Sequence, residues 1–298
     1  MDESKSVEPS SPASSVRKSR VTPFADDADN AVRPVLEIGR FAPKKAEDDI
    51  VLETGIDLSD RAKIVFVIGR GKTGKTTLLR WMAERTLEAG RPFLMADIDP
   101  TNASFSSYFP DVSRPSGFEP VEVRAWLQRF IAYAVEQNTT ALVDLGGGDT
   151  VLRSLLAEMP AIFSEIEAAG LAPVALYLCG PQPDDLAPLV SFASHGFAPA
   201  AHAIVFNEGV AEAGLARLKS FAEILRHSAV ASEIQSGGLV LWMPRLFAAA
   251  AVESRRAFFA DVRDGKTAWP ANLFDRARVR AWLETMERRF AGIASWMP

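Results

Sequence analysis

Short apolar runs alternate along the chain with segments in which apolar residues recur at helical spacing. The runs are rich in Val, Ile, Leu and Phe and contain few polar positions, which is typical of strands buried on both faces of a parallel sheet. They are Ile64–Ile68, Phe93–Ala96, Ala141–Leu145, Val174–Cys179, Ala203–Phe206 and Leu239–Trp242. The helical segments are Thr77–Glu88, Val121–Glu136, Val151–Ala168, Asp185–Ser194, Leu215–His227 and Ala248–Val262. This order predicts an α/β fold with a doubly wound, mostly parallel sheet and helices on both faces.

The two ends of the chain depart from this alternation. Residues 1–60 are rich in Ser, Pro and Asp and carry apolar residues without a period, so we expect a disordered acidic tail. Residues 61–298 then form one domain. Its last segment, residues 274–297, has an apolar face with Val279 and Trp282 and arginines opposite, which predicts an amphipathic helix packed on the sheet. The alternative is a surface helix that binds a membrane or a partner.

The composition is that of a soluble globular protein. Of the 298 residues, 48% are hydrophobic and 24% are charged, which excludes collagen-like and disulfide-scaffold classes. One cysteine, Cys179, excludes a disulfide within the chain. No run approaches the roughly 18 apolar residues that span a bilayer, and the N-terminal residues lack the apolar stretch of a secretory signal. We therefore expect a cytoplasmic protein.

The strongest motif is Gly69-Arg70-Gly71-Lys72-Thr73-Gly74-Lys75-Thr76, which follows a predicted strand and opens a predicted helix. It matches the G-x-x-x-x-G-K-[ST] phosphate loop, in which backbone N–H groups and the helix N-terminus surround phosphate oxygens. In such loops the lysine reaches the β- and γ-phosphates and the hydroxyl binds Mg²⁺. The motif predicts nucleotide-binding residues, which are Gly71, Lys72, Thr73, Gly74, Lys75, Thr76 and Thr77.

Acidic residues end the next two predicted strands. Asp97 and Asp99 lie at the end of one, and Asp144 ends the other and is followed by Gly146-Gly147-Gly148. Because parallel strands present their carboxyl ends at one edge of the sheet, these carboxylates are predicted to hold Mg²⁺ and orient the attacking water. The glycines, Gly148 among them, predict a segment that moves when the γ-phosphate leaves.

Together the three motifs over residues 62–262 resemble those of the ParA/MinD family of deviant-Walker ATPases. The resemblance implies a slow ATPase that uses ATP and Mg²⁺, dimerises in the ATP-bound state and acts in plasmid or DNA partition, transfer or the positioning of division sites. It implies that Lys75 binds phosphate, that Asp99 positions the hydrolytic water, and that Asp144 supports Mg²⁺. Thr76 and Asp97 are the other Mg²⁺ ligands that the motifs themselves predict. It also implies that Asn207 and Pro244 bind adenine. The sequence Asn207-Glu208-Gly209-Val210 lacks the Asn-Lys-x-Asp motif of GTPases, which favours ATP.

Two loop residues depart from the family pattern. Arg70 stands where the family has the signature lysine that reaches the partner's phosphates, and Lys72 replaces a glycine. Arg70 keeps the charge needed for a catalytic contact across the dimer, but Arg and Lys are not interchangeable. These changes leave open a non-hydrolysing nucleotide-binding adaptor of a conjugation, mobilisation or secretion machine. A membrane-associated ATPase like MinD is a further alternative.

The net charge of −5 belongs to the predicted tail. Residues 1–60 hold 8 basic and 13 acidic residues, so residues 61–298 are neutral. Within them, residues 245–298 hold 10 basic and 6 acidic residues. The acidic net charge of the whole chain therefore excludes neither an activating partner protein nor non-specific DNA binding through the C-terminal arginines. The alternative to DNA binding is that these arginines form an ordinary solvated basic face.

Overall fold

A computed structural model describes residues 50–99, 104–146 and 150–298. The chain divides into two units, Met1–Asp48 and Asp49–Pro298, and the described residues all belong to the second. Gly148 and residues 1–49 of the predicted tail lie outside the described residues.

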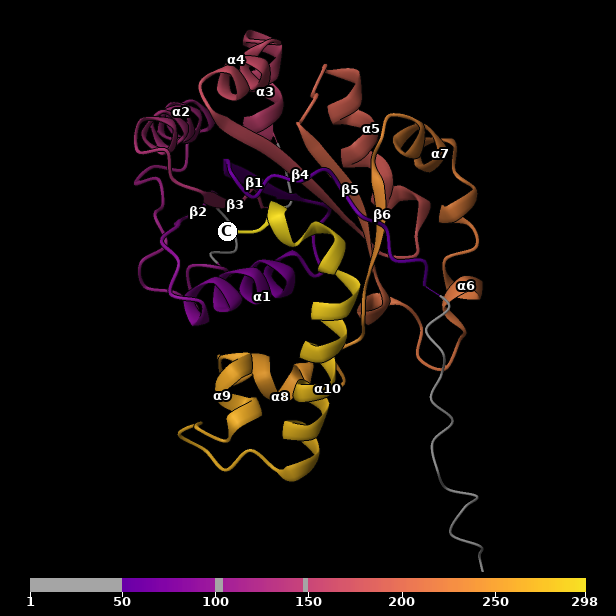
Figure 1. Ribbon diagram of the computed structural model, residues 1–298. Helices are drawn as coiled ribbons and strands as arrows, with labels where there is room; N and C mark the ends of the chain where they lie inside the picture. Colours follow the sequence, from indigo (N-terminus) through magenta and orange to yellow (C-terminus); the bar gives the residue numbers. More distant parts are fainter. Residues whose placement is uncertain (1–49, 100–103, 147–149) are drawn as a thin grey trace, which may run out of the picture. The chain divides into compact units, whose positions relative to one another are not determined.

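The centre of the second unit is a sheet in which every described strand pairs in parallel (Figure 1). Its order, β2-β3-β1-β4-β5-β6, places β1 beside both β3 and β4. The strands are β1 (Ala62–Ile68), β2 (Leu94–Asp97), β3 (Ala141–Asp144), β4 (Leu171–Cys179), β5 (Ala201–Asn207) and β6 (Leu239–Met243). Each contains or overlaps one of the six predicted runs, so the predicted parallel α/β sheet is confirmed.

Helices cover both faces of this sheet, which confirms the doubly wound arrangement (Figure 1). On β1, Val65 and Val67 enter one hydrophobic core, whereas Ile64, Phe66 and Ile68 enter the other. The first core includes α1 (Lys75–Glu88), α8 (Ala249–Glu253), α9 (Phe259–Asp264) and α10 (Leu273–Arg289). The second includes α2 (Pro120–Glu136), α3 (Thr150–Glu158), α4 (Ile162–Ala168), α5 (Ala187–Ser194) and α7 (Ser228–Gln235).

Three predicted helices are broken. Residues 151–168 form α3 and α4, and Pro160 lies between them because proline cannot continue a helical hydrogen-bond ladder. Residues 248–262 form α8 and α9, and Arg256 between them has a left-handed backbone with φ 50°. Residues 215–227 form only α6 (Arg217–Ser220) and the 3₁₀ turn η4 (Ile224–Arg226), and α7 follows them where no helix was predicted. Further 3₁₀ turns are η2 (Pro183–Leu186), η3 (Glu208–Val210) and η5 (Ala291–Trp296).

The folded unit begins earlier than predicted. Residues 50–60, which we assigned to the tail, contact the C-terminal end of the chain: Gly55 N–H donates to Gly292 O (2.9 Å). Leu58 is buried in the first core. The predicted boundary at residue 60 is therefore about ten residues too late, because a few long-range contacts order a segment that has no hydrophobic period of its own.

The predicted C-terminal helix packs on the sheet. Val279, Trp282, Met286 and Phe290 of α10 and its C-cap are buried in the first core, as the apolar stripe predicted. The helix ends at Arg289, and the rest of the predicted segment forms η5. No helix within the described ranges has both the length and the apolar character needed to cross a membrane.

Candidate functional site

The phosphate loop joins the end of β1 to the start of α1. Lys72 (φ 68°) and Gly74 (φ 99°) have left-handed backbones on either side of Thr73, whose Oγ1 donates to Arg70 O (2.9 Å). Helix α1 begins at Lys75 after its N-cap Gly74, whose carbonyl oxygen accepts from the N–H groups of Thr77 (3.0 Å) and Leu78 (3.2 Å). The N–H groups that precede Thr77 at this helix start have no partner within the helix. This geometry gives the loop the N–H groups and the positive end of a helix dipole that bind phosphate.

The Lys75 ammonium is held against the loop. Its Nζ donates to Gly69 O (2.7 Å) and to Arg70 O (3.0 Å), and the residue is 8% exposed. These bonds compensate for the burial of the charge. They also direct two loop carbonyl oxygens toward the lysine, which leaves the loop N–H groups for an anion.

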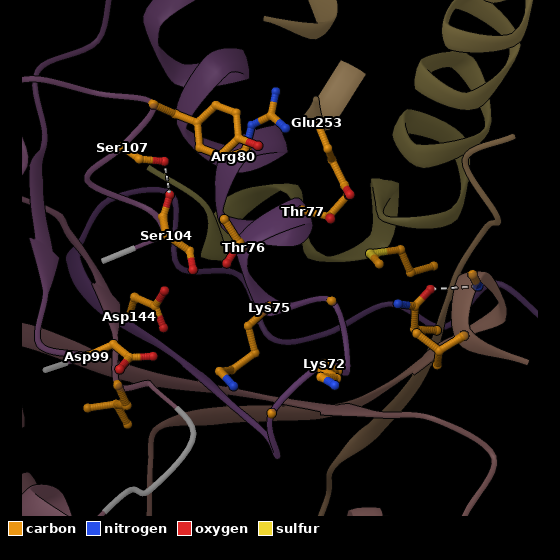
Figure 2. A pocket seen from close by; sticks show the side chains of 18 of the residues that line it. Lys72, Lys75, Thr76, Thr77, Arg80, Asp99, Ser104, Ser107, Asp144 and Glu253 are labelled. Atoms are coloured by element: carbon orange, nitrogen blue, oxygen red, sulfur yellow. Dashed lines mark hydrogen bonds between the residues drawn. The ribbon is translucent and has the colours of Figure 1, made fainter. Parts of the chain in front are cut away.

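A cavity of about 1050 Å³ adjoins the loop (Figure 2). Of the predicted site residues, the cavity is lined by Gly71, Lys72, Gly74, Lys75, Thr76, Thr77, Asp99, Asp144, Asn207 and Pro244. The fold therefore brings together residues that are up to 173 positions apart (Gly71 to Pro244). Arg70, Thr73 and Asp97 are not among its lining residues.

Thr76, Asp99 and Asp144 offer oxygen atoms to one part of this cavity (Figure 2). Burial, the largest effect, raises the pKa of Asp144 to about 6, with a smaller contribution from Asp97, while the Gly146 N–H and Lys75 oppose the rise. The described residues contain no group of three or more His, Cys, Asp and Glu that could hold a metal. The Asp144 carboxylate and the Thr76 hydroxyl nevertheless fit Mg²⁺ in a phosphate site, because this ion usually takes one or two carboxylates, phosphate oxygens and water.

Asp97 has a structural position. It is fully buried, its Oδ1 accepts the N–H of Asp99 (3.1 Å) and its Oδ2 accepts the N–H of Ser106 (2.9 Å). The predicted metal ligand thus does not line the cavity. Its carboxylate instead fixes the backbone that carries Asp99, because each of its two oxygens already accepts a hydrogen bond.

The two residues predicted to bind adenine are both engaged within the protein. The Asn207 amide donates to Thr73 O (2.7 Å) and accepts from Gly209 N–H (2.7 Å). Pro244 O accepts from the indole of Trp282 (2.9 Å). Both residues line the cavity, but in this structure their polar groups have protein partners.

Arg70 lies at the rim of the loop, beside two acidic residues that precede α5. Its guanidinium is 3.7 Å from a carboxylate oxygen of Asp184 and 3.8 Å from one of Asp185. The Arg70 side chain is 48% exposed, so these are surface ion pairs that stabilise the fold little.

Several polar residues that line the cavity were not predicted from the sequence. Among them are Arg80 on α1, Glu253 on α8, and Ser104 and Ser107 after β2 (Figure 2). Tyr108, also after β2, lines the cavity as well. Arg80 stands four residues after Thr76, and this helical spacing was a signal that could have identified it. Glu253 gave no such signal, because only the fold brings α8 to α1.

Arg80 connects the cavity to a buried acid. Its guanidinium lies 3.7 Å from the centre of the Tyr108 ring and 3.4 Å from an oxygen of Glu84. Phe259 N–H also donates to Glu84 (2.6 Å). Burial, the largest effect, raises the pKa of Glu84 to about 7, although Arg80 and backbone N–H groups lower it.

Comparisons with known proteins find similarity in structure only. No protein-family model matches the sequence, and no curated protein sequence matches it. The cell division protein MinD of Aquifex aeolicus is 10% identical, with a TM-score of 0.40 over 76% of this chain and 97% of that one. FtsY of Mycoplasma mycoides is 19% identical, with a TM-score of 0.36 over 53% of this chain and 56% of that one. The chain therefore spans little more than half the length of this FtsY structure.

Proposed function

We propose that this protein is an ATP-binding switch that hydrolyses ATP slowly with Mg²⁺. The observation that supports the proposal is the shared cavity. Lys75, held by two loop carbonyl oxygens, lines it together with Thr76, Asp99 and Asp144. In this proposal the loop N–H groups and Lys75 bind the phosphates, and Asp99 orients the attacking water. Thr76 and Asp144 would hold Mg²⁺, which neutralises phosphate charge when bound.

The test measures ATP binding by calorimetry and turnover by phosphate release with the full chain. Lys75→Ala is expected to lose binding, because it removes the cation of the phosphate site. Asp99→Asn is expected to keep binding and lose turnover. The matched controls are Lys219→Ala and Asp111→Asn, because both residues are exposed and neither lines the cavity. A wild-type protein that neither binds nor hydrolyses ATP refutes the proposal.

The second candidate is a nucleotide-binding adaptor that does not hydrolyse ATP. Two observations favour it: Lys72 holds a left-handed backbone that glycine adopts more readily, and Arg70 is paired with Asp184 and Asp185 within its own chain. ATP binding without turnover, in the presence of DNA, would support this candidate and exclude the first.

The proposed active form is an ATP-dependent homodimer in which Arg70 reaches the partner's phosphates. Arg70→Ala is then expected to abolish dimerisation with ATP while the monomer still binds ATP, as measured by light scattering and calorimetry. The control Arg61→Ala removes another partly exposed ion-paired arginine, which contacts Glu167 rather than the loop. Dimerisation of Arg70→Ala at the wild-type ATP concentration contradicts this role.

A role in DNA partition or transfer rests on the C-terminal arginines. Several of them have partners within the chain: Arg255 lies against the Trp269 ring (4.0 Å), and Arg263 pairs with Glu88 and Asp264. DNA binding would therefore be weak and sensitive to salt. Filter binding of random duplex DNA with ATP, at low and high salt, tests it, and sedimentation with anionic vesicles tests membrane attachment.

A further inference from the structure

The Asn207 side chain connects the end of β5 to the phosphate loop. It is 3% exposed, and its amide nitrogen donates to Thr73 O across 134 residues of sequence. Its amide oxygen accepts from Gly209 N–H in the turn that follows β5. Both polar ends of the amide are therefore used to join two parts of the site.

The bonded carbonyl belongs to the most constrained part of the loop. Thr73 stands between Lys72 and Gly74, the two loop residues with left-handed backbones. Glycine adopts such a conformation readily, but at Lys72, which has a Cβ, the surrounding structure must hold it. The hydrogen bond from Asn207 to Thr73 O, which lies between these two residues, restrains the backbone of both.

Close packing leaves the amide little freedom to turn away. A Cβ added to Gly74 would lie 2.3 Å from the Asn207 nitrogen, and one added to Gly209 would lie 2.8 Å from its oxygen. Two glycines thus allow the loop and the η3 turn to approach the amide from opposite sides. Gly74 therefore has two reasons to be glycine: a Cβ would clash with the Asn207 amide, and its φ of 99° favours a residue without a Cβ.

We propose that Asn207 is a positioning residue, which holds the phosphate loop in the conformation that binds phosphate and does not read the nucleotide base. The proposal rests on the function proposed above. In this proposal Asn207 supports phosphate binding through the loop, even though the residue itself lines the cavity beside Val210, Met243 and Pro244. Its loss is therefore expected to weaken every ligand that uses the loop, whether or not the ligand carries a base.

The test compares MgATP with magnesium tripolyphosphate, which has the phosphates but no base, by calorimetry on the full chain. In Asn207→Ala, both affinities are expected to fall by the same factor, roughly tenfold or more for a lost buried hydrogen bond. Asn207→Leu keeps the side-chain volume and removes the same bonds, so it gives the answer if Asn207→Ala does not fold. Val210→Ala changes an apolar residue of the same cavity wall and removes neither hydrogen bond of Asn207, so it is the control, and its tripolyphosphate affinity is expected to stay at the wild-type value.

Hydrogen–deuterium exchange without nucleotide supplies a second readout. Residues 69–76 are expected to exchange faster in both Asn207 variants and at the wild-type rate in Val210→Ala. A variant that loses ATP affinity but keeps tripolyphosphate affinity makes Asn207 a base reader and overturns the proposal. The proposal is also overturned if the Asn207 variants keep the wild-type affinities for both ligands and the wild-type exchange rate of residues 69–76. If the wild type binds neither ligand, the proposed function fails, and the exchange of the loop still decides the role of Asn207.

Discussion

Lys72 is expected to destabilise the folded protein through its backbone. The residue is exposed and has φ 68°, a left-handed value that an L-residue with a Cβ adopts at a cost of about 1–2 kcal/mol. Glycine has no such penalty but loses more chain entropy on folding, about 0.5–1 kcal/mol. The difference predicts that Lys72→Gly raises the free energy of unfolding by about 0.5–1 kcal/mol.

Urea denaturation followed by tryptophan fluorescence measures this change, and thermal unfolding is expected to shift by about 1–4 °C. Lys72→Ala is the matched control, because it removes the same charge near Lys75 and Arg70 but keeps a Cβ. A gain in both variants would come from charge, whereas a gain in Lys72→Gly alone comes from the backbone. Asn138→Gly is a second control, since Asn138 (φ 45°) is exposed and asparagine tolerates this backbone better. Lys72→Gly with the stability of Lys72→Ala would refute the reasoning.

Three further predictions concern buried polar groups. Since the folded pKa of Glu84 is raised to about 7, its protonation stabilises the fold below pH 4.5, and this contribution of up to about 3 kcal/mol is lost as the pH rises through 7. Urea titrations of Glu84→Gln should therefore lack that part of the pH dependence of the unfolding free energy. A pH profile identical to that of the wild type would contradict this prediction. Trp282→Phe removes the bond to Pro244 O and is expected to lower the free energy of unfolding by about 1–2 kcal/mol, with no change as the refuting result. Asp97→Asn places an NH₂ group against one of two backbone N–H groups and should cost about 1–3 kcal/mol in the same assay, so wild-type stability would exclude the assigned role.

Most of the fold followed from local sequence patterns. The six strands were predicted because residues buried on both faces of a parallel sheet must be apolar throughout, and this requirement is visible in runs such as Ile64–Ile68. The breaks in the helices were harder to place. Pro160 was a local signal for one of them, but the left-handed Arg256 that separates α8 from α9 was not.

The sequence indicated which residues gather at the candidate site but gave less information on which contacts each of them makes. The loop spacing predicted that Lys75 and Thr76 lie at the start of the helix after the loop, and both line the cavity there, because strand, glycine turn and helix are contiguous in the chain. Asp97 and Asp99 are two residues apart on one strand end, and the pattern could not tell which carboxylate lines the cavity. The fold decided it, since Asp97 turns to the Ser106 backbone while Asp99 lines the cavity.

The sequence by itself thus determined the parallel sheet, the phosphate loop and the edge of the sheet at which the acids gather. All of these depend on short-range spacing and on the period of buried side chains. Tertiary structure alone decided that residues 50–60 join the folded unit, that Glu253 lines the cavity, and that Asn207 bonds to Thr73. The physical reason is common to the three. Each depends on contacts between segments far apart in the chain, and the hydrogen-bond partner of a buried polar group is set by where the packed elements place it.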